Sequence, residues 1–252
     1  GRIHSTLNQT ETRTGRISST EPNMQNIPVR TETGREMRKF FVAKEGYTLL
    51  DADYSQIELR VVAAMCDDEN MKNAFLSGTD IHTATASKVF GLPESMISPE
   101  MRRAAKAVNF GIIYGIGAFS LSKDIGSTVK EADRYIKNYL ESYSGVKKFM
   151  EEAVESAMKN GYVTTIYGRR RYIPEIASSN KVVQAFGKRA AMNAPVQGSA
   201  ADIIKQAMVN VYKRLKEENL DAKLILQVHD ELIVEVSEKD KERAKVVLGE
   251  EM

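Results

Sequence analysis

The sequence predicts an α+β fold, in which a small antiparallel sheet carries acidic residues and a mainly helical segment is inserted between its strands. Two observations predict it. Short apolar runs at 47–50 and 223–236 have the length and composition of strands, and both adjoin carboxylates. Between them, residues 67–143 repeat apolar side chains at helical spacing almost throughout.

The composition is that of an ordinary folded protein. Of the 252 residues, 42% are hydrophobic and 28% are charged, and the net charge of +2 means that any surface for a polyanion must be a local patch. The single cysteine, Cys66, excludes a disulfide framework and a thiolate metal site, and it suits a reducing cytoplasm. No apolar run reaches membrane-spanning length, and the N-terminus lacks the apolar core of a signal peptide. Because the sequence starts at Gly1 without an evident start of an element, we expect it to be part of a longer protein.

The N-terminal elements lead up to the first acid. Residues 1–36 are polar and predict an irregular segment with little core of its own. The apolar run at 47–50 predicts a strand that ends near Asp53. Ser55 then stands where a helix N-cap is expected, with Glu58 three residues on, which is the spacing of a capping box.

The remaining elements are predicted from periodicity and from turn residues. In order, they are helices within 67–143 and at 145–160, short strands at 163–166 and 172–174 around a basic turn, a helix at 181–218, a hairpin at 223–236 and a charged helix at 239–252. Pro195 should bend or break the long helix. The hairpin carries His229, Asp230 and Glu231 at its tip.

Asp53 and the pair Asp230-Glu231 are the first candidates for a functional site. Carboxylates at strand ends repel one another when they lie close, and a divalent cation removes that cost. With one cysteine and three scattered histidines, the ligands would be oxygens, which favours Mg²⁺, with Mn²⁺ as a substitute, over Zn²⁺. The spacing equally permits a simpler interpretation, in which Asp53 caps the next helix and Asp230-Glu231 form a polar turn.

A second candidate is a helix face on which four side chains follow one another at intervals of four residues: Arg102, Lys106, Phe110 and Tyr114. Cations at one end and aromatic rings at the other match a nucleoside triphosphate, which has a charged tail and a flat base. In the alternative interpretation, the rings belong to the core and the cations are solvated. The motifs of P-loop and Rossmann nucleotide sites are absent from the sequence.

Five segments stand out by their sequence and by their order. They are Thr14-Gly15-Arg16-Ile17-Ser18-Ser19 with Pro22-Asn23-x-Gln25-Asn26-Ile27-Pro28, then Asp53-Tyr54-Ser55-Gln56-Ile57-Glu58-Leu59-Arg60, Arg102-x-x-x-Lys106-x-x-x-Phe110-Gly111-x-x-Tyr114-Gly115, Met192-Asn193-x-Pro195-Val196-Gln197-Gly198 and Gln227-Val228-His229-Asp230-Glu231-Leu232. In this order they resemble the motifs of family A DNA polymerases of the bacterial DNA polymerase I type. Five ordered motifs are far more specific than any one of them.

The resemblance implies template-directed DNA synthesis, in which a primer 3′-hydroxyl attacks a deoxynucleoside triphosphate and pyrophosphate leaves by a two-metal mechanism. The implied catalytic residues are Asp53, Asp230, Glu231 and Lys106, with two Mg²⁺ held by Asp53, Asp230 and the Tyr54 carbonyl. The residues implied to contact the nucleotide are Arg102, Lys106, His82, Gln56, Phe110, Tyr114 and Glu58. Those implied to contact primer–template DNA, mostly through the minor groove, are Arg16, Gln25, Asn26, Arg189, Asn193, Gln197 and His229.

Three of these positions carry implied specificity. Glu58 would block a ribose 2′-hydroxyl and so favour deoxynucleotides. A phenylalanine rather than a tyrosine at Phe110 implies better discrimination against dideoxynucleotides. Tyr114 would occupy the template stacking position until a templating base enters.

The resemblance also implies an organisation. Residues 1–36 would be the thumb-to-palm connection and the start of the palm, 37–66 the palm with the first catalytic motif, 67–180 the helical fingers, and 181–252 the remaining palm with its long helix, acidic hairpin and last helix. The expected protein is a monomer in the bacterial cytoplasm, associated with the nucleoid and not with a membrane, that acts in DNA replication and repair.

Three other functions stay open. Because family members carry further segments on both sides, this chain alone could bind primer–template DNA with little activity. A single-subunit RNA polymerase shares the acids and the lysine–tyrosine helix, although Glu58 and Phe110 favour a DNA polymerase. A two-metal nuclease would need additional acidic or histidine ligands.

Overall fold

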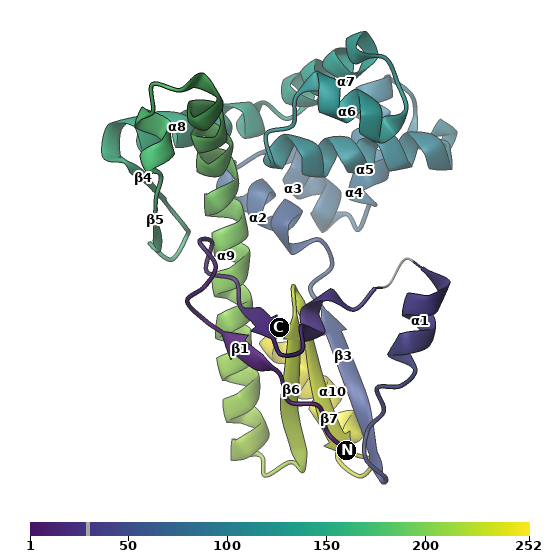
Figure 1. The fold of residues 1–252 in the computed structure, drawn as a ribbon. Coiled ribbons are helices and arrows are strands. Elements are labelled where there is room, and N and C mark those ends of the chain that lie inside the picture. The colour runs from purple at the N-terminus through teal and green to yellow at the C-terminus, as the bar shows by residue number, and fades with distance from the viewer. Residues whose placement is uncertain (29–30) are drawn as a thin grey trace. The chain divides into compact units, whose positions relative to one another are not determined.

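The computed structural model describes residues 1–28 and 31–252, and it confirms the predicted α+β class (Figure 1). The described residues form two compact units. The first unit consists of Gly1–Ile57 and Ala200–Met252, and the second of Glu58–Ser199.

The first unit is built on a three-stranded antiparallel sheet in the order β3-β7-β6. Its strands are β3 (Tyr47–Asp53), β6 (Ala222–Val228) and β7 (Glu231–Ser237), which confirms the predicted strand and hairpin. The register pairs Asp53 with Glu231 at one end of β3 and Tyr47 with Ser237 at the other. The β6–β7 connection is a two-residue turn, so the sheet itself fixes where the acids of the hairpin lie.

One face of this sheet packs against helices. Alternate residues of β7, namely Leu232, Val234 and Val236, are fully buried, as the two-residue period of a strand requires. They share a core with residues of the C-terminal half of α9 (Lys181–Glu217) and of α10 (Lys241–Glu251), including Val211 and Val247. This core holds the strands that carry the acids.

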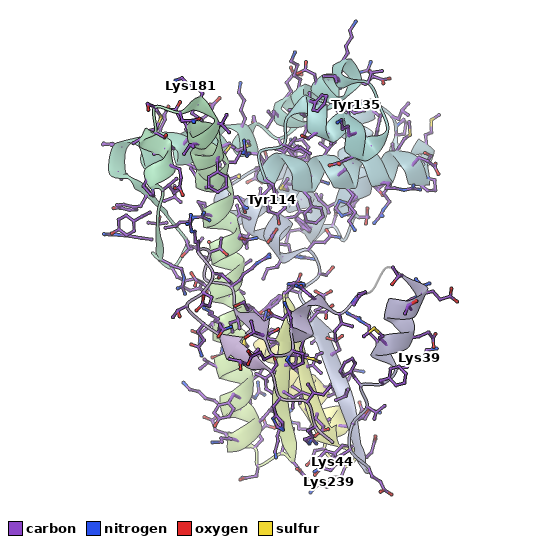
Figure 2. All side chains as sticks on the ribbon, in the orientation of Figure 1. Lys39, Lys44, Tyr114, Tyr135, Lys181 and Lys239 are labelled. Atoms are coloured by element: carbon purple, nitrogen blue, oxygen red, sulfur yellow. The ribbon has the colours of Figure 1, made fainter. Side chains whose placement is uncertain are left out.

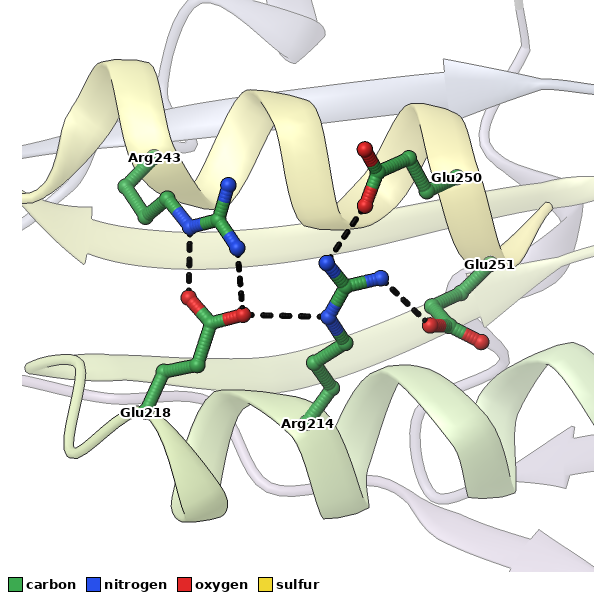
Figure 3. Close-up of polar contacts among 5 residues, drawn as sticks. All are labelled: Arg214, Glu218, Arg243, Glu250 and Glu251. Atoms are coloured by element: carbon green, nitrogen blue, oxygen red, sulfur yellow. Dashed lines mark hydrogen bonds and ion pairs between the residues drawn. The ribbon is translucent and has the colours of Figure 1, made fainter.

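An ion network joins α9 to α10 on the surface of the same unit (Figure 3). Arg243 donates to both carboxylate oxygens of Glu218, at 2.5 and 2.6 Å, and Arg214 donates to Glu218 at 3.0 Å. Arg214 also pairs with Glu250 at 2.5 Å and Glu251 at 2.8 Å. The Arg243 guanidinium, more than that of Arg214, lowers the pKa of Glu218 to about 2.

The N-terminal segment is more ordered than the sequence predicts. Strands β1 (Thr6–Asn8) and β2 (Ser18–Thr20) pair antiparallel, and η1 (Met24–Asn26) and α1 (Glu32–Arg38) follow them. The Thr31 hydroxyl accepts from the Gly34 backbone N–H and caps α1. The prediction of an irregular segment is therefore wrong in part, because short elements closed by such local bonds leave little periodic signal.

The second unit is mainly helical, as predicted. Its elements are α2 (Ile57–Met65, whose first residue is assigned to the first unit), α3 (Glu69–Leu76), α4 (Ile81–Phe90), η2 (Glu94–Met96), α5 (Pro99–Ile113), α6 (Ala118–Ile125), α7 (Val129–Ser142), α8 (Ser144–Asn160), β4 (Tyr162–Thr164), β5 (Arg170–Tyr172), η3 (Pro174–Ala177) and the start of α9. Side chains of Asp68, Asp80, Ser98 and Thr128 cap four of the helices. Helix α4 packs against α5 and α7.

The capping box predicted at Ser55 and Glu58 is wrong. Helix α2 begins at Ile57, so Gln56 and not Ser55 precedes it. Ser55 and Gln56 have φ of 44° and 63°, in the left-handed region, and these two residues turn the chain between β3 and α2. The predicted cap assumed an ordinary extended residue at this junction.

Of the two outcomes predicted at Pro195, the break is wrong, because α9 runs from Lys181 to Glu217 as one helix. The ring removes one backbone donor, while Ala194, Val196 and their neighbours are buried, so packing compensates for the lost bond. The Ser199 hydroxyl donates to the Pro195 carbonyl at 2.6 Å. Among the described residues, no helix combines the length and the apolar character needed to cross a membrane.

Candidate functional site

The structure brings the predicted acids together at one end of the β3–β7 pair. Asp53 is the last residue of β3, and its register partner is Glu231, the first residue of β7. Asp230 lies in the adjoining turn, and its carbonyl accepts from the Tyr54 backbone N–H at 3.3 Å. The end of β3 and the tip of the hairpin are thus held side by side by backbone hydrogen bonds.

Charges at this end of the sheet interact. Burial, then the charges of Asp51 and Asp53, raise the pKa of Glu231, and Arg38 opposes them. Burial and the Asp53 carboxylate likewise raise the pKa of Asp51. Asp51 was not among the sequence candidates, although it lies two residues before Asp53 on the same side of a strand. The carboxylates therefore repel one another, as they would in a site that binds a cation.

The carboxylate oxygens at this end of the sheet suit a hard divalent cation. No group of three or more His, Cys, Asp or Glu side chains within residues 1–28 and 31–252 is arranged to hold a metal ion by itself. Mg²⁺ needs no such group, because it usually takes one or two carboxylates and completes its shell with water and substrate phosphates. The simpler interpretation of Asp53 as a helix cap does not hold, since its carboxylate accepts from Ser55 N–H at 2.9 Å, ahead of α2.

The tip of the hairpin is braced from η1. The Gln25 side-chain amide donates to the carbonyl and the side-chain oxygen of Gln227, at 3.1 and 3.0 Å. The Gln227 amide in turn donates to the His229 carbonyl. Gln25 is buried, whereas His229, with φ of 56°, and Asn26 are exposed and Arg16 is half-buried. Of the predicted DNA contacts in this unit, Gln25 is thus engaged inside the protein.

The predicted row on α5 lies on the side of the helix away from its core. Arg102, Lys106 and Tyr114 are exposed and Phe110 is half-buried, with Tyr114 at the C-terminal end of the helix (Figure 2). The buried residues of α5 are Ala105, Val108, Asn109, Ile112 and Ile113. The alternative interpretation of Tyr114 as a core residue is therefore wrong.

Arg102 has a partner that the sequence pattern does not predict. Its Nε and a terminal nitrogen donate to the two carboxylate oxygens of Asp80, at 3.0 and 2.7 Å. These bonds are the main reason why the pKa of Asp80 falls to about 2. Asp80 also caps α4 by accepting from Thr83 N–H at 2.8 Å, so one carboxylate connects the start of α4 to the start of the α5 row.

The other end of the row contacts Glu58 and the first half of α9. The Tyr114 hydroxyl donates to the Glu58 carboxylate, and Glu58 is buried. Gly115 has φ of 69°, and a Cβ there would lie 2.7 Å from Cγ of Arg189. The positive φ favours glycine here, and a side chain would also displace that of Arg189 on the α9 segment that carries Arg189, Asn193 and Gln197 at four-residue spacing.

Two predicted contact residues have an enclosed oxygen without a hydrogen bond. Among the described residues, Oε1 of Gln56 and Oδ1 of Asn193 have no partner. Enclosed polar atoms normally have one, from the protein, water or a ligand. Both are therefore atoms for which a bound substrate could supply the missing hydrogen bond.

His82 lies near the middle of the α5 row. Its ring centroid is 5.8 Å from that of Phe110, and only 2% of the residue is exposed. Burial lowers the pKa of His82 to about 4; the charge of Asp80 opposes this shift, whereas the charges of Arg102 and Lys106 act in the same direction as burial. His82 is therefore a neutral imidazole near neutral pH.

Comparisons with known proteins identify the family of this chain. Residues 1–252 match the family described as DNA polymerase family A. The thermostable DNA polymerase I of Thermus filiformis is 52% identical over 252 residues, which are 100% of this chain and 30% of that protein. DNA polymerase I of Bacillus subtilis (strain 168) is 52% identical over 252 residues, which are 100% of this chain and 29% of that protein.

A solved structure gives the same result. The POL domain of Pol1 from M. smegmatis, in complex with DNA primer-template and dNTP, matches with a TM-score of 0.96 and 47% identity over 100% of this chain and 44% of that chain. The chain spans about 30% of the length of the curated relatives it matches. It belongs to DNA polymerase family A.

Proposed function

We propose that the protein containing this chain performs template-directed DNA synthesis, adding deoxynucleoside triphosphates to a primer 3′-hydroxyl with release of pyrophosphate. The pairing of Asp53 with Glu231, beside Asp230, is the observation that carries this proposal. These carboxylates converge at one end of the sheet, and the proposal is further supported by the family match and by a solved relative that was bound to primer-template and dNTP.

Asp53, Asp230 and the Tyr54 carbonyl would hold two divalent cations, Mg²⁺ or Mn²⁺, with Glu231 close by. When bound, such ions make the primer hydroxyl a better nucleophile and offset charge on the leaving pyrophosphate. The chain's own contribution is to position the carboxylates, which the sheet register and the Tyr54–Asp230 backbone bond do. No covalent intermediate with the protein is required.

The α5 row would bind the incoming nucleotide. Arg102 and Lys106 offer positive charge to the triphosphate, and Phe110 offers a ring to the sugar and base. His82 would donate a hydrogen bond to a phosphate oxygen, and Gln56 has an oxygen free for a further contact. The order of charges before rings along the helix sets the direction in which a nucleotide lies.

The sugar would be selected at Glu58. Its carboxylate is buried and held by Tyr114, so a ribose 2′-hydroxyl placed against it would meet a fixed side chain. This contact favours a DNA polymerase over the single-subunit RNA polymerase. The ratio of deoxynucleotide to ribonucleotide incorporation distinguishes the two.

Primer–template DNA would contact Arg16, Gln25, Asn26, Arg189, Asn193, Gln197 and His229. Minor-groove acceptors are nearly alike for every correct base pair, so these residues would sense pairing geometry and not sequence. Residues 67–180 would act as fingers and the segments on either side as palm. Since the relatives are bacterial, we place the protein in a bacterial cytoplasm, at the nucleoid, as a monomer in replication and repair.

Primer extension tests the proposal. The assay uses the chain itself and a chimera in which the chain replaces the matching 252 residues of the Bacillus subtilis polymerase, with and without Mg²⁺. We expect Mg²⁺-dependent, template-directed extension by the chimera with deoxynucleotides, and weaker or no extension by the chain alone, which lacks the rest of the relatives' length. Failure of the chimera to extend a primer would overturn the proposal, and so would a preference for ribonucleotides.

A further inference from the structure

A chain of buried hydrogen bonds ends on His82. The Tyr143 hydroxyl lies 3.1 Å from the Thr85 hydroxyl, which is 3.1 Å from Oδ1 of Asn109. Nδ2 of Asn109 lies 3.0 Å from Nδ1 of His82. Tyr143, Thr85 and Asn109 are fully buried, and they come from three segments that pack together: α4, α5 and the end of α7.

The chemistry of these groups fixes the direction of the hydrogen bonds. If Tyr143 donates to Thr85 and Thr85 donates to Oδ1 of Asn109, both hydroxyl protons have an acceptor. The Asn109 amide nitrogen then donates to Nδ1 of His82. In the reverse direction the Tyr143 hydroxyl would accept from Thr85, and its own proton would have no acceptor among the described residues. The first arrangement is therefore the satisfied one.

The direction decides which nitrogen of His82 carries the proton. An imidazole that accepts at Nδ1 while neutral has its proton on Nε2. Nε2 makes no hydrogen bond with the described residues. The charged groups that act on the ring are Asp80, Arg102 and Lys106, at the phosphate end of the predicted nucleotide row.

The tautomer matters because the ring is uncharged. A neutral imidazole cannot attract a phosphate by charge, so only an N–H at Nε2, the nitrogen that Asn109 does not contact, favours the interaction. With the proton on Nδ1, the ring would present a lone pair to a phosphate oxygen and repel it.

We propose that Asn109 and Thr85 are positioning residues, which hold His82 as the Nε2–H tautomer so that the neutral ring donates a hydrogen bond to a phosphate oxygen of the incoming nucleotide. The tautomer of His82 follows from the buried hydrogen bonds alone. Only the claim that a nucleotide phosphate accepts from Nε2 rests on the proposed function. A purely structural role is less economical, because apolar side chains could fill the same space without needing buried partners.

Nitrogen-15 NMR of the free chain tests the tautomer without any nucleotide. The chain has only three histidines, so labelling histidine alone gives a simple spectrum, and a His82→Gln variant assigns its signals. We expect Nε2 of His82 to be the protonated nitrogen and Nδ1 the unprotonated one near neutral pH. Protonation of Nδ1 in the unchanged chain would overturn the proposal.

Variants test whether these buried hydrogen bonds determine the tautomer of His82. Asn109→Leu and Thr85→Val should both let His82 populate the Nδ1–H tautomer, whereas Thr85→Ser, which keeps the hydroxyl, should restore the original one. Asn138→Leu is the control, because it removes a half-buried amide that donates to the Val89 carbonyl at 2.9 Å in the same unit. An unchanged His82 tautomer in folded Thr85→Val and Asn109→Leu chains would overturn the proposal.

Kinetics of the chimera test the use of the hydrogen bond. Asn109→Leu should raise the KM for a deoxynucleoside triphosphate by about tenfold, the scale of one hydrogen bond to a charged group, with a smaller change in kcat. In a His82→Ala background the same substitution should have no further effect. A full additional effect there would overturn the action through His82, whereas an inactive chimera would contradict the proposed function and leave the NMR result in place.

Discussion

The Tyr114 hydroxyl donates a hydrogen bond of 2.5 Å to the Glu58 carboxylate. Glu58 is 7% exposed, so the bond stabilises the carboxylate where little water reaches it. The residue implied to select the sugar is thereby fixed by the residue implied to occupy the template stacking position.

Replacing Tyr114 with phenylalanine should weaken sugar selection. Without the Tyr114 hydroxyl, the Glu58 carboxylate loses one of the bonds that hold it against an incoming ribose. We expect ribonucleotide incorporation to rise by about three- to tenfold, the scale of one net hydrogen bond. The kcat/KM ratio for a deoxynucleotide and its ribonucleotide measures the change. Tyr167→Phe, an exposed tyrosine of the β4–β5 turn, is the control. Equal ratios in Tyr114→Phe and the unchanged protein would refute the role of the bond.

Replacing Asp80 with asparagine should tighten triphosphate binding at low salt. Asparagine still caps α4, so the main change is the loss of one negative charge beside Arg102. Two unit charges about 8 Å apart in water interact by about 0.5 kcal/mol, and a triphosphate carries several, so the gain exceeds the roughly 0–1 kcal/mol of an exposed ion pair. Titration with a nucleoside triphosphate at rising salt measures it. Weaker binding would show that Asp80 chiefly orients Arg102.

The ion network between α9 and α10 should stabilise the fold at neutral pH and lose this effect at acidic pH. The folded-state pKa of Glu218, about 2, lies below its ordinary value of 4.5, so its contribution is complete above about pH 4.5 and is lost as the pH falls toward 2. The Tm difference between the unchanged chain and Glu218→Gln should therefore shrink across that interval. Glu238→Gln is the control, because its carboxylate lies 3.8 Å from Lys241. A constant Tm difference across the interval would contradict this origin of the stability.

Replacing Phe110 with tyrosine should reduce discrimination against dideoxynucleotides. The added hydroxyl would lie beside the sugar and could replace a hydrogen bond that a dideoxynucleotide cannot make. We expect the relative incorporation of a dideoxynucleotide to rise by about three- to tenfold, the scale of one net hydrogen bond. Competition between the two nucleotides in primer extension measures it, with Phe119→Tyr on α6 as the control because Phe119 is exposed. An unchanged ratio would place Phe110 away from the sugar.

Local patterns predicted the sheet and the row on α5 because both depend on short-range geometry. A two-residue turn between apolar strands fixes the register of Glu231, and a four-residue interval aligns Arg102 with Lys106 whatever the rest of the chain does.

Tertiary contacts decided what the sequence did not predict. The Thr85–Asn109 bond depends on how α4 packs against α5, and single polar residues inside helices carry no sign of it. The left-handed turn at Ser55 and Gln56 contradicts the ordinary preference of those residues, so a capping pattern there was misleading.

Single-turnover primer extension with Asp53→Asn and Asp230→Asn chimeras examines the paired acids themselves. Both substitutions keep the size of the side chain and remove its charge, and each should slow nucleotide addition by at least about a thousandfold. Asp221→Asn, which removes an acid at the other end of the same sheet where it accepts from the Tyr47 hydroxyl, should leave the rate nearly unchanged. Rates for Asp53→Asn and Asp230→Asn equal to that of Asp221→Asn would contradict the assignment of these carboxylates to catalysis.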